Sequence, residues 1–234
     1  MTSHPTSHLQ AIRASYNTVA VDYAELLKDE LENKPFDRAM LAAFADKVRA
    51  GGGGEVADLG CGPGRVTVHL EGLGLDAYGI DLSPEMVAVA RRGHPHLRFE
   101  VGSMTGLDIK DDSLAGALAW YSTVHTPLNE LPLFFREFNR VLAPGGHLLI
   151  AFKVGDERVR LEHAYGHDVD LHVYRFPPER VAELLRTAGL VEVARLVREA
   201  DARENTAQAF ILARKPEADA EAGAESGAEA EAAP

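Results

Sequence analysis

Three glycines at alternate positions follow a short apolar run and give the clearest sign of a ligand site. The run Val56–Leu59 is typical of a buried strand, and it leads into Gly60, Gly62 and Gly64. Glycine permits positive φ and lets the backbone approach a ligand closely. A helix that begins after such a turn presents free N–H groups in its first turn. The segment therefore predicts a backbone cradle for a ligand.

An acidic side chain follows this turn at the end of the next expected strand. Asp81 lies 21 residues after Gly60 and ends the apolar run Ala77–Ile80. An acid at this place accepts hydrogen bonds from both hydroxyls of a ribose. The structural alternative is a tight turn in which Asp81 caps the helix that begins near Ser83. We favour the ligand site, because three glycines in one turn cost conformational entropy that a plain connection does not require.

A nicotinamide-dependent reductase would also bind its cofactor with a glycine-rich turn and an acid at the end of the next strand, but with a different glycine spacing. Its fingerprint is G-x-G-x-x-G, whereas residues 60–64 have G-x-G-x-G. The end of the chain also argues against it. The segments Val191–Val197 and Ala207–Ala213 follow each other with only a loop between them, which is typical of an antiparallel pair. The reductase therefore remains the second hypothesis.

The sequence resembles the class I S-adenosylmethionine-dependent methyltransferases that act on small molecules. VADLGCGPG at 56–64 resembles the first motif of this family and GIDLSPEMV at 79–87 its second. RVLAPGGHLLI at 140–150 resembles a strand entry that is common in the group. The resemblance implies methyl transfer from S-adenosylmethionine to an oxygen, nitrogen or sulfur nucleophile of a small metabolite, with S-adenosylhomocysteine as product. A third hypothesis is a protein that binds this cofactor without catalysis.

The resemblance also implies cofactor contacts in the first two motifs. The three glycines would line the methionine part of the cofactor, and Asp58 would fix its amino group or the turn itself. Asp81 would bind the ribose. Two apolar side chains, Leu82 and Met86, would lie against the adenine.

The residues after the third expected strand, Leu97–Val101, depart from the family pattern. The family often has an Asp there that accepts a hydrogen bond from the adenine amino group, whereas this chain has Gly102-Ser103-Met104. Ser103 is a weaker acceptor. Met104 would cover the adenine face.

The segment after the fourth expected strand, Leu114–Trp120, borders the ligand crevice of an open α/β sheet. Aromatic rings there can face a sulfonium cation, which makes Trp120 and Tyr121 candidates, with core packing as the alternative for both. His125 is the candidate general base, because an oxygen acceptor loses a proton and imidazole titrates near neutral pH. A histidine here can instead cap a helix or hold a loop. A thiolate or amine acceptor would require no strong base, and positioning and water exclusion would then carry much of the catalysis.

Tyr16 and Tyr23 lie seven residues apart in the amphipathic segment 9–30, so they share one face of the expected helix. In similar methyltransferases this helix closes over the cofactor, and a YxxxAxxY-like stretch contacts it. This chain has YNTVAVDY at 16–23. We expect a lid that contacts the cofactor, with a pair of core tyrosines as the alternative.

Histidines and aromatic residues gather after the fifth expected strand, His147–Phe152. In the family this region often forms the wall of the acceptor pocket. The residues expected to line it are His163, Tyr165, His167, Tyr174 and Arg175. No metal is expected, because Gly166 interrupts the histidine pair and no carboxylate or cysteine arrangement completes a site.

Strands that alternate with helices must position all of these residues. The pattern predicts a parallel sheet covered on both sides by helices. It is followed by a strand near 169–176 with one face exposed to solvent, and by a helix from Pro177 to Gly189. With the resemblance, the expected fold is α/β and Rossmann-like, a seven-stranded sheet that is mostly parallel with an antiparallel C-terminal hairpin. We expect an N-terminal helical cap over residues 1–50, the methyltransferase domain over 51–215 and a disordered acidic Ala/Glu tail over 216–234.

Composition narrows the function further. The 234 residues include 36 acidic and 24 basic ones, a net charge of −12. The expected tail holds six acidic and no basic residues, which leaves 30 acidic and 24 basic residues and a net charge of −6 for the rest. An acidic chain is a poor partner for nucleic acid or an anionic membrane. With one cysteine, no apolar span and no signal-like N-terminus, we expect a soluble cytoplasmic protein that acts on a small molecule. The oligomeric state stays open.

Overall fold

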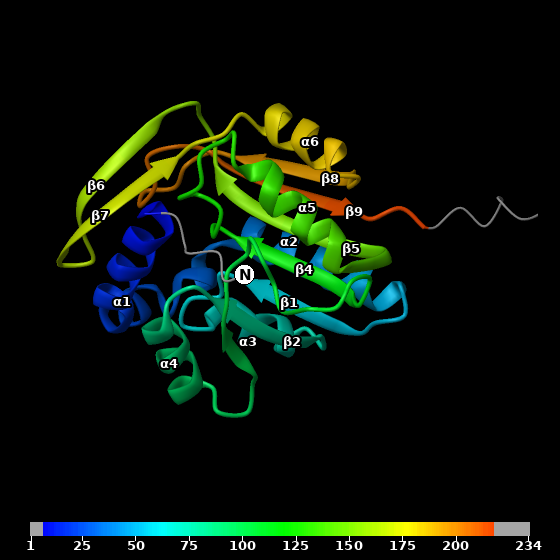
Figure 1. Cartoon of the computed structure of the whole chain (residues 1–234), viewed down its shortest axis with the longest axis horizontal. Helices are drawn as coiled ribbons and strands as arrows, with labels where there is room; N and C mark the ends of the chain where they lie inside the picture. The colour runs from blue at the N-terminus through cyan, green and yellow to red at the C-terminus, as the bar shows by residue number, and fades with distance from the viewer. Residues whose placement is uncertain (1–6, 218–234) are drawn as a thin grey trace, which may run out of the picture.

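A seven-stranded sheet in the order β3-β2-β1-β4-β5-β9-β8 forms the centre of the molecule (Figure 1). The computed structural model describes residues 7–217. The strands of this sheet are β1 Glu55–Leu59, β2 Asp76–Asp81, β3 Phe99–Val101, β4 Leu114–Trp120, β5 Leu142–Lys153, β8 Val191–Arg198 and β9 Gln208–Arg214. The first five pair in parallel, and β9 runs antiparallel to both β5 and β8. The expected mostly parallel sheet with an antiparallel C-terminal hairpin is therefore confirmed.

Helices cover both faces of this sheet. They are α1 Ser7–Leu27, α2 Pro35–Ala50, α3 Arg65–Gly72, α4 Pro84–Gly93, α5 Leu131–Val141 and α6 Pro178–Thr187, with a 3-10 turn η1 at Glu30–Asn33. The apolar side chains of α5 and α6 pack on one face, and those of α2 and α3 pack on the other (Figure 1). Among residues 7–217, no helix is long and apolar enough to cross a membrane.

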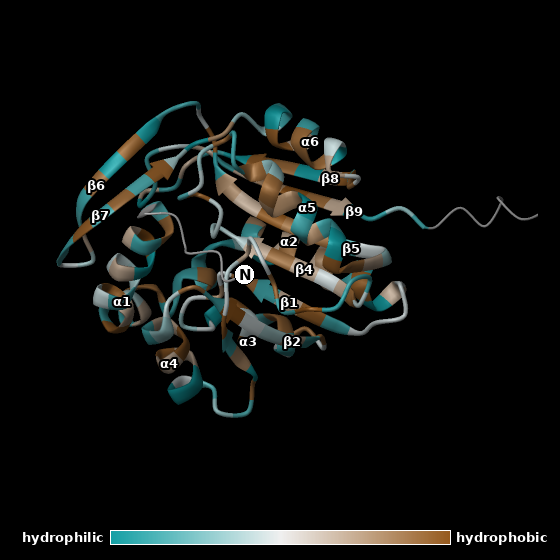
Figure 2. Cartoon of the chain, viewed as in Figure 1, coloured by the Kyte–Doolittle hydropathy of each residue, from teal (hydrophilic) through white to brown (hydrophobic). Residues whose placement is uncertain are grey.

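Alternation along the strands explains how one sheet serves two cores. In β5, Leu148 and Ile150 contact the α5 and α6 side, while Leu149 and Ala151 contact the α2 and α3 side. Successive side chains of a strand point to opposite faces, so a strand covered on both sides is apolar at every position. The central strands are accordingly mostly brown in Figure 2, whereas the helices alternate between brown and teal. Burial of each leucine or isoleucine side chain of this kind contributes about 1.5–3 kcal/mol.

A separate hairpin, β6 Arg158–Ala164 with β7 His167–Tyr174, stands beside α1 (Figure 1). The sequence predicts a strand in the β7 region but not its partner, because β6 alternates mostly exposed charged residues with partly buried ones. Tyr165 and Gly166 form its two-residue turn and have φ values of 53° and 83°. Two successive positive φ angles match the right-handed twist of a hairpin.

Three predicted boundaries differ from the structure. The first helix ends at Leu27, and a separate 3-10 turn follows. β3 begins at Phe99 rather than at residue 97. β5 begins at Leu142 rather than at His147, because Leu142 pairs with Leu114 of β4. Of the expected tail, residues 218–234 lie outside the described part of the chain.

Helix α1 is fixed to two other elements at the carboxyl end of the sheet. Val19 and Ala20 are buried against Met86 of α4. On the other side, the Ser15 hydroxyl accepts a hydrogen bond from the backbone N–H of Asp170 in β7, at 3.2 Å. Because α1 contacts both α4 and β7, it spans the edge at which the parallel strands end.

Candidate functional site

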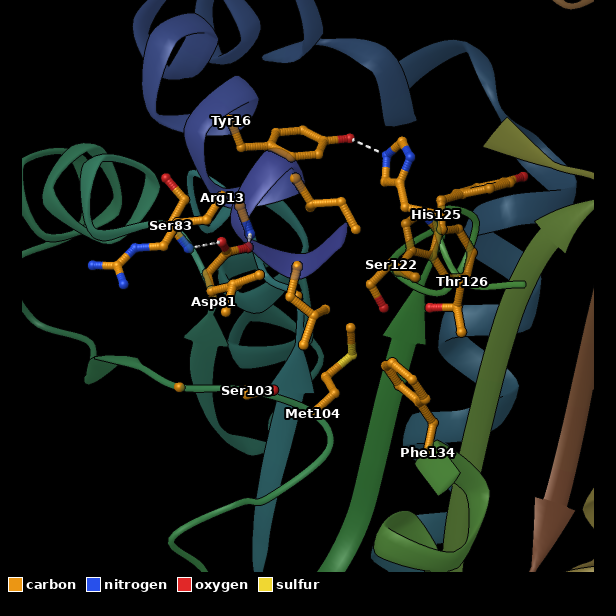
Figure 3. Close-up of a pocket in the computed structure, with 18 of the residues that line it drawn as sticks. Arg13, Tyr16, Asp81, Ser83, Ser103, Met104, Ser122, His125, Thr126 and Phe134 are labelled. Atoms are coloured by element: carbon orange, nitrogen blue, oxygen red, sulfur yellow. Dashed lines mark hydrogen bonds between the residues drawn. The ribbon is translucent and has the colours of Figure 1, made fainter. Parts of the chain in front are cut away.

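A cavity of about 790 Å³, counting the space open to solvent, lies where β1, β2 and β4 end beneath α1. The carboxyl edge of an open parallel sheet is the usual place for a ligand crevice. Figure 3 shows side chains from α1, from the loops after these strands and from α5 that face this space. The residues predicted to bind the cofactor that line it are Tyr16, Tyr23, Gly60, Gly62, Asp81, Leu82, Ser103, Met104, Trp120 and Tyr121.

The glycine-rich turn has the geometry that only glycine accepts without strain. Gly60 and Gly62 have φ values of 76° and 55°. A Cβ on Gly60 would lie 2.3 Å from the Cβ of Ser122, so this glycine allows two loops to meet. A Cβ on Gly62 would meet only a Tyr23 ring atom, at 3.8 Å, so the backbone here is open. The turn therefore presents bare backbone to the cavity.

Asp81 closes one side of the cavity and is held by two backbone donors (Figure 3). The N–H of Gly62 donates to Oδ2 and the N–H of Ser83 donates to Oδ1, each at 2.8 Å. A carboxylate oxygen accepts about two hydrogen bonds, so each oxygen keeps capacity for a further donor. Burial raises the pKa of Asp81, and the two N–H groups oppose that rise.

Three predicted cofactor residues lie behind the cavity rather than along it. Gly64 is the N-cap of α3 with φ of 85°, and a Cβ there would lie 2.7 Å from the Phe99 ring. Met86 is buried under α1. Asp58 accepts a hydrogen bond from the Thr67 hydroxyl at 2.7 Å. Thus Gly64 and Met86 pack the surrounding elements, while Asp58 lies beneath the turn.

Asp58 is buried, and only one of its two carboxylate oxygens has a hydrogen-bond partner in the described structure. Its Oδ1 has no hydrogen-bond partner among the residues that the structure describes. Burial raises the pKa of Asp58 to about 7, although the hydrogen bond from Thr67 opposes the shift. The motif therefore contains a carboxyl group that exchanges a proton near neutral pH.

The opposite wall of the cavity is largely apolar. Met104 and Phe134 point into it (Figure 3). The Ser103 hydroxyl is already hydrogen-bonded to that of Thr105, at 2.8 Å. This wall therefore suits a flat apolar surface, and Ser103 offers less acceptor capacity than the Asp frequent in similar proteins.

His125 lies in the loop after β4, with both ring nitrogens hydrogen-bonded. Its Nδ1 lies 2.7 Å from the backbone oxygen of His172, and its Nε2 lies 2.7 Å from the hydroxyl of Tyr16. A carbonyl oxygen only accepts, so Nδ1 carries the proton and Nε2 accepts from Tyr16. Burial lowers the pKa of His125 to about 4, so the ring is neutral at pH 7.

Tyr121 adopts a left-handed backbone conformation that residues other than glycine rarely take. Its φ is 54°, which costs roughly 1–2 kcal/mol for a residue other than glycine. Its hydroxyl is buried without a hydrogen-bond partner in the described part of the chain. The neighbouring Trp120 is buried and packs against Phe210. Trp120 thus combines core packing with an edge on the cavity, while Tyr121 is held under strain beside it.

A second cavity of about 1520 Å³, also counting space open to solvent, adjoins the first. The two share Tyr16, Tyr23, Tyr121 and His125. The second is bounded by the β6–β7 hairpin, the start of α3 and the loop before β9. The shared residues therefore mark the place where two chambers meet.

Comparison with known proteins identifies the domain. Residues 56–146 match the methyltransferase domain family. The chain carries a class I methyltransferase domain. The resemblance derived from the motifs is thereby confirmed, and the glycine-rich turn, Asp81 and His125 all fall within the matched segment.

Individual similar proteins agree with this family. An uncharacterized methyltransferase of Mycobacterium tuberculosis strain H37Rv is 35% identical over 107 residues, which cover 44% of this chain and 42% of that protein. A malonyl-[acyl-carrier protein] O-methyltransferase of Erwinia billingiae is 31% identical over 139 residues, covering 59% and 53%. The chain thus spans about half the length of the curated relatives it matches.

A solved structure extends the likeness over nearly the whole chain. It is a 1,6-didemethyltoxoflavin N1-methyltransferase of Burkholderia thailandensis with bound 1,6-didemethyltoxoflavin and S-adenosylhomocysteine. The TM-score is 0.62 at 20% identity, covering 92% of this chain and 94% of that one. The likeness establishes a shared fold.

Only one of the predicted acceptor-wall residues lines either of the two cavities described above. Tyr165 lines the second cavity. His163 and His167 lie at the tip of the β6–β7 hairpin, where they face Asp168 and Asp22 at 3.1 and 2.7 Å. At the tip, the two imidazoles therefore contact carboxylates of the hairpin and of α1 and do not reach either cavity.

The other two predicted wall residues lie at the base of the same hairpin. Tyr174 packs against the core on the α5 side. The Arg175 guanidinium faces Glu157 at 3.5 Å. Among residues 7–217, no three His, Cys, Asp or Glu side chains gather in a way that could hold a metal ion.

Several residues that line the two cavities are not among the site residues predicted from the sequence. Ser122 and Thr126 follow β4, and Lys153 is the last residue of β5. The rule that residues just beyond parallel strands face the crevice identifies all three. Arg65 carries a similar signal, because it opens α3 directly after the glycine-rich turn.

Proposed function

We propose that this protein transfers the methyl group of S-adenosylmethionine to an oxygen, nitrogen or sulfur nucleophile of a small metabolite and releases S-adenosylhomocysteine. The observation that carries the proposal is the meeting of two cavities at Tyr16, Tyr23, Tyr121 and His125. The first contains the glycine-rich turn and Asp81 and suits the cofactor. The second has room for an acceptor. A methyl transfer requires the two reactants to meet in line at one place.

The residues of the first cavity fit this cofactor. Asp81 keeps acceptor capacity for two ribose hydroxyls, and the backbone at Gly60 and Gly62 leaves room for the methionine part. Leu82 and Met104 offer apolar surface to the adenine. When bound, S-adenosylmethionine supplies an electrophilic methyl group on a sulfonium sulfur.

Unpartnered polar atoms support the same fit. The Oδ1 of Asp58 and the hydroxyl of Ser122 are buried without hydrogen-bond partners in the described structure. Buried polar groups are normally hydrogen-bonded, so an unpartnered atom that lines a binding cavity, as in Ser122, or lies just behind its wall, as in Asp58, suits a donor or acceptor of a ligand. Asp58 lies beneath the turn that would hold the methionine part, in keeping with a role in fixing the cofactor's amino group or the turn.

Tyr16 and His125 provide a route for the proton of an oxygen acceptor. The Tyr16 oxygen takes the acceptor's proton while its own proton passes to His125 Nε2, which already accepts from it. The carbonyl of His172 remains hydrogen-bonded to Nδ1–H and stabilises the resulting imidazolium. Because the ring is a weak base, the transfer accompanies formation of the new bond to the methyl carbon, when the acceptor's proton is most acidic.

Two of the similar proteins, those of Erwinia billingiae and Burkholderia thailandensis, support a small organic acceptor group and leave its reacting atom open. By name, one is an O-methyltransferase of malonyl-[acyl-carrier protein] and the other an N1-methyltransferase of 1,6-didemethyltoxoflavin. We therefore keep oxygen, nitrogen and sulfur acceptors within the proposal. A nitrogen or sulfur acceptor that arrives without its proton needs only positioning from the shared residues.

Calorimetric titration with S-adenosylmethionine and S-adenosylhomocysteine tests the proposal. Both are expected to bind in the micromolar range, and Asp81→Ala should lose at least about 100-fold, roughly 2.7 kcal/mol, because two hydrogen bonds to a charged group disappear. Asp76→Ala, an exposed acid at the other end of β2, is the matched control and should bind normally. Failure of both ligands to bind while a nicotinamide cofactor binds would overturn the proposal. Screening of acceptors by mass spectrometry follows a positive result.

A further inference from the structure

Charged side chains are concentrated in the second cavity. Those that line it are the cations Lys34, Arg65, Lys153 and Arg203 and the carboxylates Glu30 and Glu204. The chain as a whole has more acidic than basic residues, whereas this cavity has four cations against two carboxylates. Such a field favours an anionic ligand.

The two carboxylates of this cavity are already engaged. Glu204 pairs with Lys34 and receives Nη1 of Arg198 at 2.5 Å. Glu30 pairs with Arg65 at 2.8 Å. Within residues 7–217, neither Lys153 nor Arg203 has an ion-pair partner for its side chain. Two of the four cations are therefore free for a ligand.

Lys153 is half-buried at the end of β5, on the same edge of the sheet as Tyr121. Its charged neighbours are Glu204 and Glu30, opposed by Arg175 and Lys34. Burial lowers the pKa of Lys153, because the ammonium group loses water without gaining a carboxylate in contact. An anion bound beside it would offset that desolvation.

Further unpartnered donors face the same cavity. Nη1 of Arg65 and the hydroxyl of Tyr121 are buried, and neither has a hydrogen-bond partner among the described residues. Lysine and arginine donate and never accept. Apart from the Tyr121 hydroxyl, which can also accept, no side-chain acceptor of this cavity is similarly buried and unpartnered in the part of the chain that the structure describes. The site therefore calls for a ligand rich in acceptor oxygens.

An apolar wall faces these donors. Leu161 of β6 and Leu171 and Val173 of β7 line the cavity together with Tyr165. Leu171 is fully buried beneath the hairpin. A ligand that satisfies both sides has an apolar body and a charged end.

We propose that the methyl acceptor is an amphipathic anion whose carboxylate or phosphate group binds Lys153, with Arg203 and the Tyr121 hydroxyl as further donors. Its apolar or aromatic body lies against the β6–β7 hairpin, and its nucleophile reaches the residues shared by the two cavities. The inference rests on the proposed function, because it takes the second cavity as the acceptor site.

Ligand-observed NMR titration of the protein saturated with S-adenosylhomocysteine tests this inference. The probes are benzoate and phenyl phosphate, with benzyl alcohol as a neutral analogue of similar shape. Both anions should bind at least tenfold more tightly than the alcohol, and their ratio shows whether carboxylate or phosphate is preferred. Lys153→Met should lose at least tenfold for the anions and little for the alcohol, whereas Lys153→Arg should stay within about threefold of wild type.

Lys47→Met is the matched control, since Lys47 is exposed on α2 and its loss changes the net charge equally. It should bind every probe like wild type. Equal binding of anions and alcohol, no binding of either anion in the millimolar range, or equal losses in both Met variants would overturn the inference. So would reduced S-adenosylhomocysteine affinity in Lys153→Met, which would assign this cation to the cofactor. Failure of wild type to bind S-adenosylhomocysteine would instead overturn the proposed function.

Discussion

The Tyr16 hydroxyl donates a hydrogen bond to Nε2 of His125 at 2.7 Å, across 109 positions of sequence. The bond joins helix α1 to the loop after β4, and the other ring nitrogen of His125 joins that loop to β7 through the carbonyl of His172. One imidazole thus fixes three elements around the place where the two cavities meet. The position of α1 and the orientation of the candidate base are consequently coupled.

This coupling predicts that Tyr16 and His125 act as one unit. With an oxygen acceptor, His125→Gln and Tyr16→Phe should each lower kcat by about 100-fold or more, because either change interrupts proton transfer. The double variant should lose little beyond either single one, as expected for residues that share a step. The pKa of about 4 predicts that protonation of the His125 ring lowers kcat/KM only well below pH 6. Steady-state kinetics of the three variants check this.

The control for the Tyr16 and His125 variants is His163→Gln, at the exposed tip of the hairpin. It removes an imidazole far along the chain from the candidate base and should leave kcat within about twofold. An unchanged kcat in His125→Gln would contradict the relay and indicate an acceptor that needs no base, or a protein that binds the cofactor without catalysis.

The first motif was predictable from sequence because its signals are local. A buried strand, alternate glycines and Asp81 at the next strand's end follow from backbone rules that hold in any parallel sheet. The structure places Gly60, Gly62 and Asp81 together in one cavity. Gly64 illustrates the limit of that reasoning, since its missing Cβ makes room for Phe99, which lies 35 positions away and cannot be inferred from the motif.

The acceptor side was less predictable because it depends on tertiary pairing. The histidines and tyrosines after β5 suggested a pocket wall, yet β6 pairs with β7 and carries His163 and His167 to an exposed turn. The wall is formed mainly by Leu161, Leu171 and Val173 from the inner side of this hairpin. Which side of a two-stranded hairpin faces inward is decided by its docking on α1, and the strand pattern alone does not encode that contact.

The two glycines of the turn should differ in their tolerance of alanine. Gly62→Ala adds only the strain of a positive φ, about 1–2 kcal/mol, because its Cβ would meet one ring atom at 3.8 Å. Gly60→Ala adds the same strain and a collision with the Cβ of Ser122 at 2.3 Å, and should destabilise the protein by clearly more. Urea unfolding of both variants measures the difference. Ser122→Gly in the Gly60→Ala background should recover part of the loss, and equal losses in the two single variants would contradict the assigned collision.

The buried carboxyl of Asp58 should make stability depend on pH in an unusual direction. Its folded pKa of about 7 lies above the ordinary 3.8, so between these values the folded protein binds a proton that the unfolded chain releases. The free energy of unfolding therefore loses up to about 4 kcal/mol from this group as pH rises from 4 to 8.

Asp58→Asn removes this titration and isolates it. In this variant the side-chain amide oxygen can still accept the hydrogen bond from the Thr67 hydroxyl, and the side chain carries no charge at any pH. Its unfolding free energy minus that of wild type should therefore rise with pH between 4 and 8, whatever constant offset the amide introduces. Urea unfolding at pH 5, 7 and 8 measures this difference, with Asp76→Asn, an exposed acid on β2, as a control that should show no such rise. A difference that stays flat would mean that Asp58 ionises as freely in the folded protein as in the unfolded chain. The unpartnered Oδ1 would then have to be solvated despite its burial.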